Sequence, residues 1–156
     1  MAIRKDKMQA ISAGNISSLL LSADALNGQV FVVGDPVAGE REVFEAEAPT
    51  DVATQEIVVI STPEVFYERN KHITDFVNPA GSIARGDHYT AADIVTITDD
   101  VIDGTSVVGQ YLIPANGKTK LVPAADLSGA TRFAAKVIEK TKIYGKDATA
   151  YRVVQC

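Results

Sequence analysis

Apolar and β-branched residues recur along this chain in short runs that turn-forming residues interrupt. From residue 28 onward the runs lie at 29–33, 41–47, 56–60, 93–98, 132–140 and 151–154. Stretches rich in glycine, asparagine, aspartate and proline separate them, at 34–36, 103–104, 116–117 and 145–147. Such runs, bounded by such residues, are typical of strands, and we expect about six to nine of them. The short connections favour an antiparallel sheet.

Two turns give the clearest hairpin signals. Asn116-Gly117 lies between the apolar runs at 105–113 and 119–122, and Asn-Gly is a pair that two-residue hairpin turns prefer. Gly145-Lys146-Asp147 lies between TKIY and AYRVV and predicts a closing hairpin at the end of the chain. The segment from 93 to 154 is therefore expected to form a barrel or a sandwich.

Two other segments have helical features. STPEV at 61–65 offers a capping hydroxyl and a proline suited to the first helical position, so one short helix is predicted over 64–76. Serines at 17 and 18 could cap a second short helix that stops at Asn27-Gly28. Asn27-Gly28 equally fits a hairpin turn between two strands, and the sequence does not decide between the two.

The N-terminal residues fit neither a helical nor a strand period, and Gly14-Asn15 would interrupt a helix. We expect residues 1–27 to form an extended arm, with or without the short helix, and residues 28–156 to form a single β-rich domain. A chain of 156 residues can bury a core of its own. The predicted fold class is mostly β: a small antiparallel barrel or sandwich with one or two short helices and an extended N-terminal arm.

Composition supports a globular protein. Hydrophobic residues make up 46% and charged residues 22% of the chain, which is typical of globular domains. No apolar run approaches the roughly 18–20 residues that span a bilayer, and no segment has the form of a signal peptide. We therefore expect no membrane partner. The single cysteine, Cys156, cannot form a disulfide within the chain and is expected to be free.

Charge is distributed unevenly along the chain. Residues 35–56 carry seven acidic residues against one basic residue, whereas residues 118–156 carry eight basic residues against three acidic ones. The acidic centre would repel phosphate, so nucleic acid is not an expected partner. Opposite charge on two regions of a small domain suits docking between proteins. The alternative is that both regions are solvated faces with no special role.

The motifs that suggest chemistry fail on spacing or context. NGKTK at 116–120 lacks the first glycine of a phosphate-binding loop and follows a strand-like run. The tripeptide at 85–87 spells an adhesion motif, but it recurs by chance and its loop needs glycine. Neither histidine has the context of a catalytic base. Scattered candidate metal ligands lack a defined spacing and fit a solvated face better: Glu68, His72, Asp75 and His88. We predict no enzymatic activity, no cofactor and no metal.

Tyr67, Arg69 and Phe76 are candidate partner-binding residues, because tyrosine and arginine often anchor interfaces. The alternative places Phe76 in the core, with the other two side chains covering it. The sequence leaves these two readings open.

The order of elements over 56–98, followed by KLV at 120–122 and the stretch 131–154, resembles the small capsid-associated proteins of tailed bacteriophages. The stretch 1–27 lies outside the resemblance, and Ala92 stands where the pattern has glycine. The most similar positions are Tyr67, Asp75-Phe76, Asn78, Ala80-Gly81, Ala84-Arg85 and Asp93-Ile94.

The resemblance implies a decoration, or cement, protein that binds the outside of an assembled capsid and stabilises its lattice. Its partners would be the major capsid protein and other copies of itself, on the exterior of a virion assembled in the host cytoplasm. The basic arm, with Arg4, Lys5 and Lys7, is the first expected lattice contact and the 64–76 segment the second. The alternatives are another virion component, such as a tail, connector or host-contact protein, and a small β-barrel module that binds a ligand at its mouth.

Overall fold

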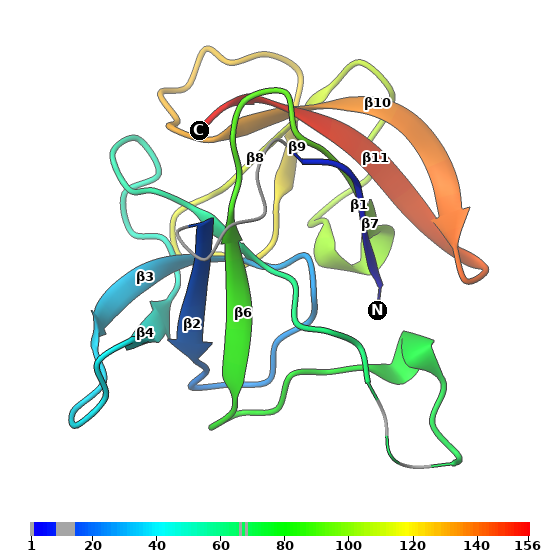
Figure 1. Ribbon diagram of the computed structural model, residues 1–156. Coiled ribbons are helices and arrows are strands. Elements are labelled where there is room, and N and C mark those ends of the chain that lie inside the picture. Colours follow the sequence, from blue (N-terminus) through cyan, green and yellow to red (C-terminus); the bar gives the residue numbers. More distant parts are fainter. Residues whose placement is uncertain (1, 9–14, 66, 68) are drawn as a thin grey trace.

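The computed structural model describes residues 2–8, 15–65, 67 and 69–156 (Figure 1). Over these residues the chain forms eleven strands and two short 3₁₀ turns. The predicted mostly β fold is confirmed, with more strands than the six to nine expected. The strands divide into a closed barrel and an open sheet that lie side by side. The barrel is formed by strands between residues 16 and 88, whereas the stretch 93–154, expected to form a barrel or a sandwich, supplies five strands of the open sheet.

Six strands form the open sheet, in the order β1-β7-β11-β10-β8-β9. Every neighbouring pair in it is antiparallel. The strands are β1 Ile3–Lys7, β7 Ile94–Thr98, β8 Tyr111–Ile113, β9 Val122–Ala124, β10 Ala134–Ile143 and β11 Lys146–Gln155.

Five strands close the barrel, in the order β2-β4-β3-β5-β6. All of its pairs are antiparallel except β2 with β4, which is parallel. The strands are β2 Ile16–Leu20, β3 Val30–Pro36, β4 Val43–Glu47, β5 Val58–Ile60 and β6 Ile83–His88.

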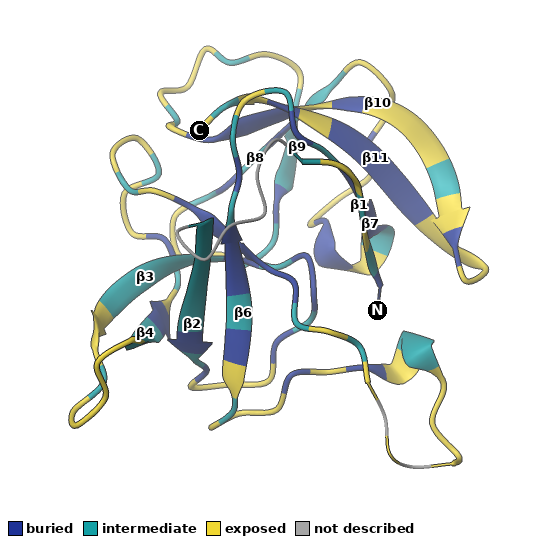
Figure 2. Cartoon of the chain, in the orientation of Figure 1, coloured by how far each residue is buried: buried dark blue, intermediate teal, exposed yellow. Residues whose placement is uncertain are grey.

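One apolar cluster joins the barrel to the sheet. Val30 and Val59 from the barrel pack in it with Ile97, Phe133 and Tyr151 from the sheet and its connections. A second, smaller cluster fills the barrel itself, with members from β2 and the residue after it, and from β4, β5 and β6: Leu19, Leu21, Ala46, Val58, Ile60 and Ala84. Figure 2 shows buried residues along β11, whereas exposed residues predominate along much of β10 and at the turn that joins the two strands. The two layers therefore share a core.

Hairpins are found at both predicted sites, but their turns differ from the prediction. Asn116-Gly117 forms a turn inside the longer connection 114–121 between β8 and β9, and the closing turn is Tyr144-Gly145, because Lys146 and Asp147 already pair in β11. β10 and β11 pair up to Ile143 and Lys146, and the two residues between them have positive φ, 49° for Tyr144 and 82° for Gly145. Two consecutive positive φ angles define the type I′ turn that suits the twist of a hairpin. Between β8 and β9, Gly117 has φ of 73° and the Lys118 amide donates to the Ala115 carbonyl at 3.1 Å. The runs at 132–140 and 141–144 largely form one strand, β10.

Neither predicted helix is found in the described residues. Ile16–Leu20 is strand β2, and between β5 and β6 the described residues contain only a 3₁₀ turn at Ile73–Asp75, capped by His72. Phe66 and Glu68, part of the second predicted helix, lie outside the described residues. A helix this short is marginal by itself. Pairing of β2 with strands on both sides outweighs the capping signal at its serines.

The N-terminal segment also differs from the expected arm. β1 pairs with β7 as an edge strand of the sheet, with Ile3 opposite Ile97 and Arg4 opposite Thr96. Ala2 is 1% exposed. Residues 9–14 of the expected arm lie outside the described residues. The partner of β1 is about ninety positions away, so no local pattern in residues 1–8 could reveal it.

Candidate functional site

The clearest polar constellation is a hydrogen-bonded chain of serine, histidine and glutamate on the barrel. Ser17 Oγ of β2 lies 2.8 Å from His88 Nε2 at the end of β6. His88 Nδ1 lies 2.7 Å from Glu56 Oε1, just before β5. The pairing of β6 with both β2 and β5 brings the three residues together. Sequence reasoning missed this chain because its members lie far apart in sequence and none has a motif context.

Such a chain has the hydrogen-bond order of a catalytic triad, in which a histidine takes the serine proton and an acid orients the histidine. A hollow of about 460 Å³ adjoins it, lined in part by Val32, Val33 and Phe44. A nucleophilic serine also needs N–H donors aimed at the oxyanion and an exposed, sharply turned position. Ser17 lies instead inside β2, which is paired on both sides. We therefore interpret the hydrogen bonds among Ser17, His88 and Glu56 as a structural brace, that is, as links that hold the strands of the barrel together.

This interpretation predicts how Ser17 behaves toward a serine-reactive probe. We expect a fluorophosphonate to leave Ser17 unmodified, as measured by intact-mass spectrometry, because Ser17 lies within a strand paired on both sides and not at a sharp, exposed turn. The Ser17→Ala variant should lose about 1 kcal/mol of unfolding free energy, the usual worth of one hydrogen bond. An adduct on the wild-type protein that is missing from Ser17→Ala would contradict the brace and identify an acyl-transfer site.

A buried carboxylate forms a second constellation at the junction of the two layers. Asp87 is 1% exposed, accepts a hydrogen bond from the Ser61 hydroxyl at 2.5 Å, and pairs with the Lys5 ammonium of β1. A buried charge is tolerated only when it is paired and hydrogen-bonded. The tripeptide at 85–87 lies inside β6 and not in the expected loop, and Asp87 is buried, so the tripeptide is not presented as an exposed loop motif.

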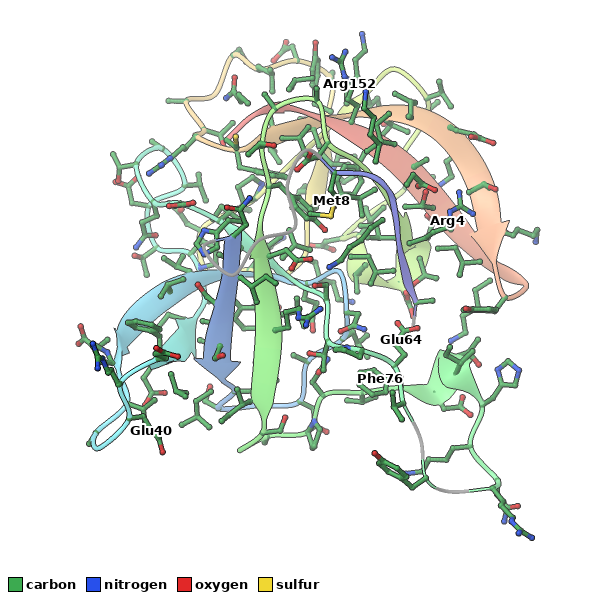
Figure 3. All side chains as sticks on the ribbon, in the orientation of Figure 1. Arg4, Met8, Glu40, Glu64, Phe76 and Arg152 are labelled. Carbon is green, nitrogen blue, oxygen red and sulfur yellow. The ribbon has the colours of Figure 1, made fainter. Side chains whose placement is uncertain are left out.

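Glu64 is another anchor for the N-terminal strand. It accepts hydrogen bonds from the Asn27 side-chain amide at 3.0 Å and from the backbone N–H of Ile3. Burial raises the pKa of Glu64, and these hydrogen bonds oppose that rise. Figure 3 shows Glu64 beside the beginning of β1. Together with the ion pair between Lys5 and Asp87, Glu64 fixes the first strand to the body.

A third polar network holds the β10–β11 hairpin. Lys140 Nζ lies 2.6 Å from Asp99 Oδ2 and donates to Thr149 Oγ1 at 2.6 Å and to Ser106 Oγ at 3.1 Å. Thr149 also donates to the second Asp99 oxygen at 2.6 Å. The donors and acceptors satisfy one another, which is typical of a structural network.

The predicted arm contacts have different environments. The guanidinium of Arg4 lies 2.5 Å from the Asp6 carboxylate and 3.4 Å from Thr96 Oγ1. Lys5 is engaged by Asp87, whereas Lys7 is exposed at the end of β1. Of the three, Lys7 is therefore the one that is exposed and forms no ion pair with another described residue.

The predicted contacts in the loop between β5 and β6 also differ from one another. Tyr67 is 97% exposed, and Arg69 and Val65 are exposed near it in sequence. Phe76 is only 9% exposed, as in the alternative that placed it in the core. Figure 3 shows Phe76 where the loop returns to the body. In this loop, defined here as residues 61–78, Tyr67 and Arg69 are therefore accessible to a partner, whereas Phe76 is buried.

The candidate metal ligands do not come together in the described part of the chain. No group of three or more His, Cys, Asp or Glu residues there is arranged to hold a metal ion. His88 belongs to the serine–histidine–glutamate chain, His72 caps the 3₁₀ turn at Ile73–Asp75, and Glu68 lies outside the described residues. Among the described residues, no helix has the length and apolar character required to cross a bilayer.

Comparison of this chain with known proteins identified no related protein. No protein-family model, no curated protein and no solved structure matches this chain. The assignment of a function depends on the residues and the geometry described above.

Proposed function

We propose that this protein is a non-enzymatic structural component of a tailed-phage virion, which binds the outside of the assembled capsid and stabilises its lattice. The observation that carries the proposal is the 61–78 loop, which lies in the stretch that resembles capsid-associated proteins. It presents Tyr67 with 97% of its surface exposed. Tyrosine and arginine are enriched among residues that dominate binding energy, and an exposed aromatic gains most from being covered.

The partners proposed are the major capsid protein and further copies of this chain, on the capsid exterior after synthesis in the host cytoplasm. A capsid repeats the same surface many times, so contacts that are weak singly become effective when they are linked. The loop extends away from the body (Figure 1), which suits a contact with a flat lattice. Because Lys5 is engaged within the chain, the loop takes precedence over the basic arm as the proposed lattice contact.

Replacing both Tyr67 and Arg69 by alanine should weaken retention on purified heads at least about tenfold, which corresponds to about 1.4 kcal/mol of binding free energy. Occupancy is measured by quantitative electrophoresis after sedimentation of heads mixed with the protein. Tyr144→Ala is the matched control, because Tyr144 is also exposed, at 59%, but lies in the β10–β11 turn.

Equal retention of the wild-type protein and the Tyr67→Ala/Arg69→Ala variant would contradict the loop contact. Failure of the wild-type protein to sediment with heads would contradict the proposed function itself. Truncation of the N-terminal segment is a poorer test, since it would remove β1 and leave Asp87 unpaired.

A further inference from the structure

A row of three cations crosses the outer face of the six-stranded sheet. Strand register places Lys7 of β1 opposite Ile94, Ile94 opposite Arg152, and Arg152 opposite Lys136. The row continues to Tyr111 of β8, whose ring centre lies 5.8 Å from Lys136 Nζ. We call Lys7, Arg152 and Lys136 the basic row.

Alternation along the strands fixes the side to which this row points. Val95, Val137 and Tyr151 belong to the adjacent cross-strand row and are fully or almost fully buried. Successive residues of a strand point to opposite faces, so Arg152 and Lys136 face solvent. Lys7 follows a register shift in β1, which places it opposite Ile94 in the same row, and it is exposed. In the described part of the chain, none of its three cations has a carboxylate within ion-pair distance.

The β3–β4 hairpin carries the opposite charge. Residues 35–47 contain five acidic residues and a single basic one, and we call this segment the acidic hairpin. Its acidic side chains form no ion pair with any described residue, and all are exposed except Glu45, which is half-buried: Asp35, Glu40, Glu42, Glu45 and Glu47.

The two charged regions lie at opposite ends of the molecule. Figure 3 shows Glu40 at the tip of the acidic hairpin and Arg152 at the far side of the open sheet. The barrel and the shared core separate them, so the two regions cannot meet within one chain. Charges beyond about 10 Å are largely screened at 0.1 M salt, so neither region neutralises the other internally.

We infer that copies of this protein associate head to tail, with the basic row of one copy against the acidic hairpin of the next. The partner that binds the basic row is a second copy of this protein, because the same chain carries both of the complementary surfaces. A polyanion such as nucleic acid would meet a protein whose net charge is −5. Contact between two different surfaces repeats from copy to copy, which gives a ring if it closes and a filament if it does not. The inference rests on the self-association within the proposed function and names its surfaces.

Charge reversal tests the inference by analytical ultracentrifugation. Sedimentation of the wild-type protein should show self-association at about 0.01 M salt, where charges act over roughly 30 Å, and its loss at about 1 M, where the range is about 3 Å. A row variant, Lys136→Glu with Arg152→Glu, and a hairpin variant, Glu40→Lys with Glu42→Lys, should each associate at least about tenfold more weakly.

An equal mixture of the two variants should restore association, because the reversed row of one complements the reversed hairpin of the other. Lys142→Glu is the control: this lysine is exposed but pairs with Asp147 at 2.9 Å in the β10–β11 hairpin. Circular dichroism establishes that each variant is folded.

A wild-type protein that stays monomeric at both salt concentrations would overturn the inference, as would a variant mixture that does not associate. Binding of a DNA oligonucleotide by the basic row of a monomeric protein would assign the row to another partner. Retention on heads is measured separately, so a protein that binds heads but remains monomeric contradicts only this inference. A protein that associates but ignores heads contradicts only the capsid proposal.

Discussion

Replacing Asp87 by alanine should lower the free energy of unfolding by about 3–5 kcal/mol, the range for removal of one partner from a buried ion pair. The change leaves the Lys5 ammonium without its carboxylate and the Ser61 hydroxyl, in a residue 5% exposed, without its acceptor. Urea denaturation followed by circular dichroism gives the value. Hydrogen exchange should also show faster opening of β1, since the ion pair attaches that strand to the barrel.

Asp103→Ala is the matched control for Asp87→Ala. Asp103 pairs with Lys118 at 2.6 Å, but about half of each side chain is exposed. Exposed pairs of this kind contribute about 0–1 kcal/mol. Equal losses of unfolding free energy in the two variants would mean that the buried pair contributes no more to stability than the exposed pair. A double substitution, Lys5→Met with Asp87→Leu, should recover much of the loss, because it leaves neither charge unpaired.

Gly28→Ala is expected to cost about 2–5 kcal/mol. Gly28 has φ of 92°, a conformation that costs other residues roughly 1–2 kcal/mol. A Cβ there would also lie 2.9 Å from Val101 Cγ2 and 3.1 Å from Ile97 Cγ2, in the core shared by barrel and sheet. Overpacking of this kind adds about 1–3 kcal/mol. The measurement is the urea midpoint at unchanged m-value.

Gly117→Ala separates the two contributions to the Gly28→Ala loss. Gly117 has φ of 73°, but a Cβ there would meet nothing within 4 Å. It should therefore show the backbone cost of about 1–2 kcal/mol without the packing cost. Identical losses of unfolding free energy in the two variants would show that the core near Val101 and Ile97 accommodates an added methyl group without a packing cost.

Local signals in the sequence were sufficient for most of the body. Alternation and β-branched content predicted most of the strands but not β1, β2 or β6, and Asn116-Gly117 and Gly145 predicted the two hairpins. Each of these features depends on residues that are neighbours in the chain. Turn chemistry and side-chain period act at that range, so they can be recognised without knowing the fold.

Features that depend on distant residues were not predictable in the same way. The strand register of β1 and the barrel position of β2 depend on which edges meet after folding, and isolated capping signals at the serines pointed elsewhere. The serine–histidine–glutamate chain has no signal in sequence because three separate elements supply it. Charge blocks indicated polarity, but the basic row became visible only through register.

The position of β1 has a consequence for the order of folding. β1 pairs with β7, and β7 pairs in turn with β11, at the C-terminal end of the described chain. During synthesis β1 therefore waits for β7, which is made about ninety residues later, and β7 in turn waits for β11, which is made later still. Pairings this distant slow folding, because the loop entropy is lost before the contacts form. The hairpin of β10 and β11, joined by two residues, closes a much shorter loop, so we expect it to form before β1 pairs with β7.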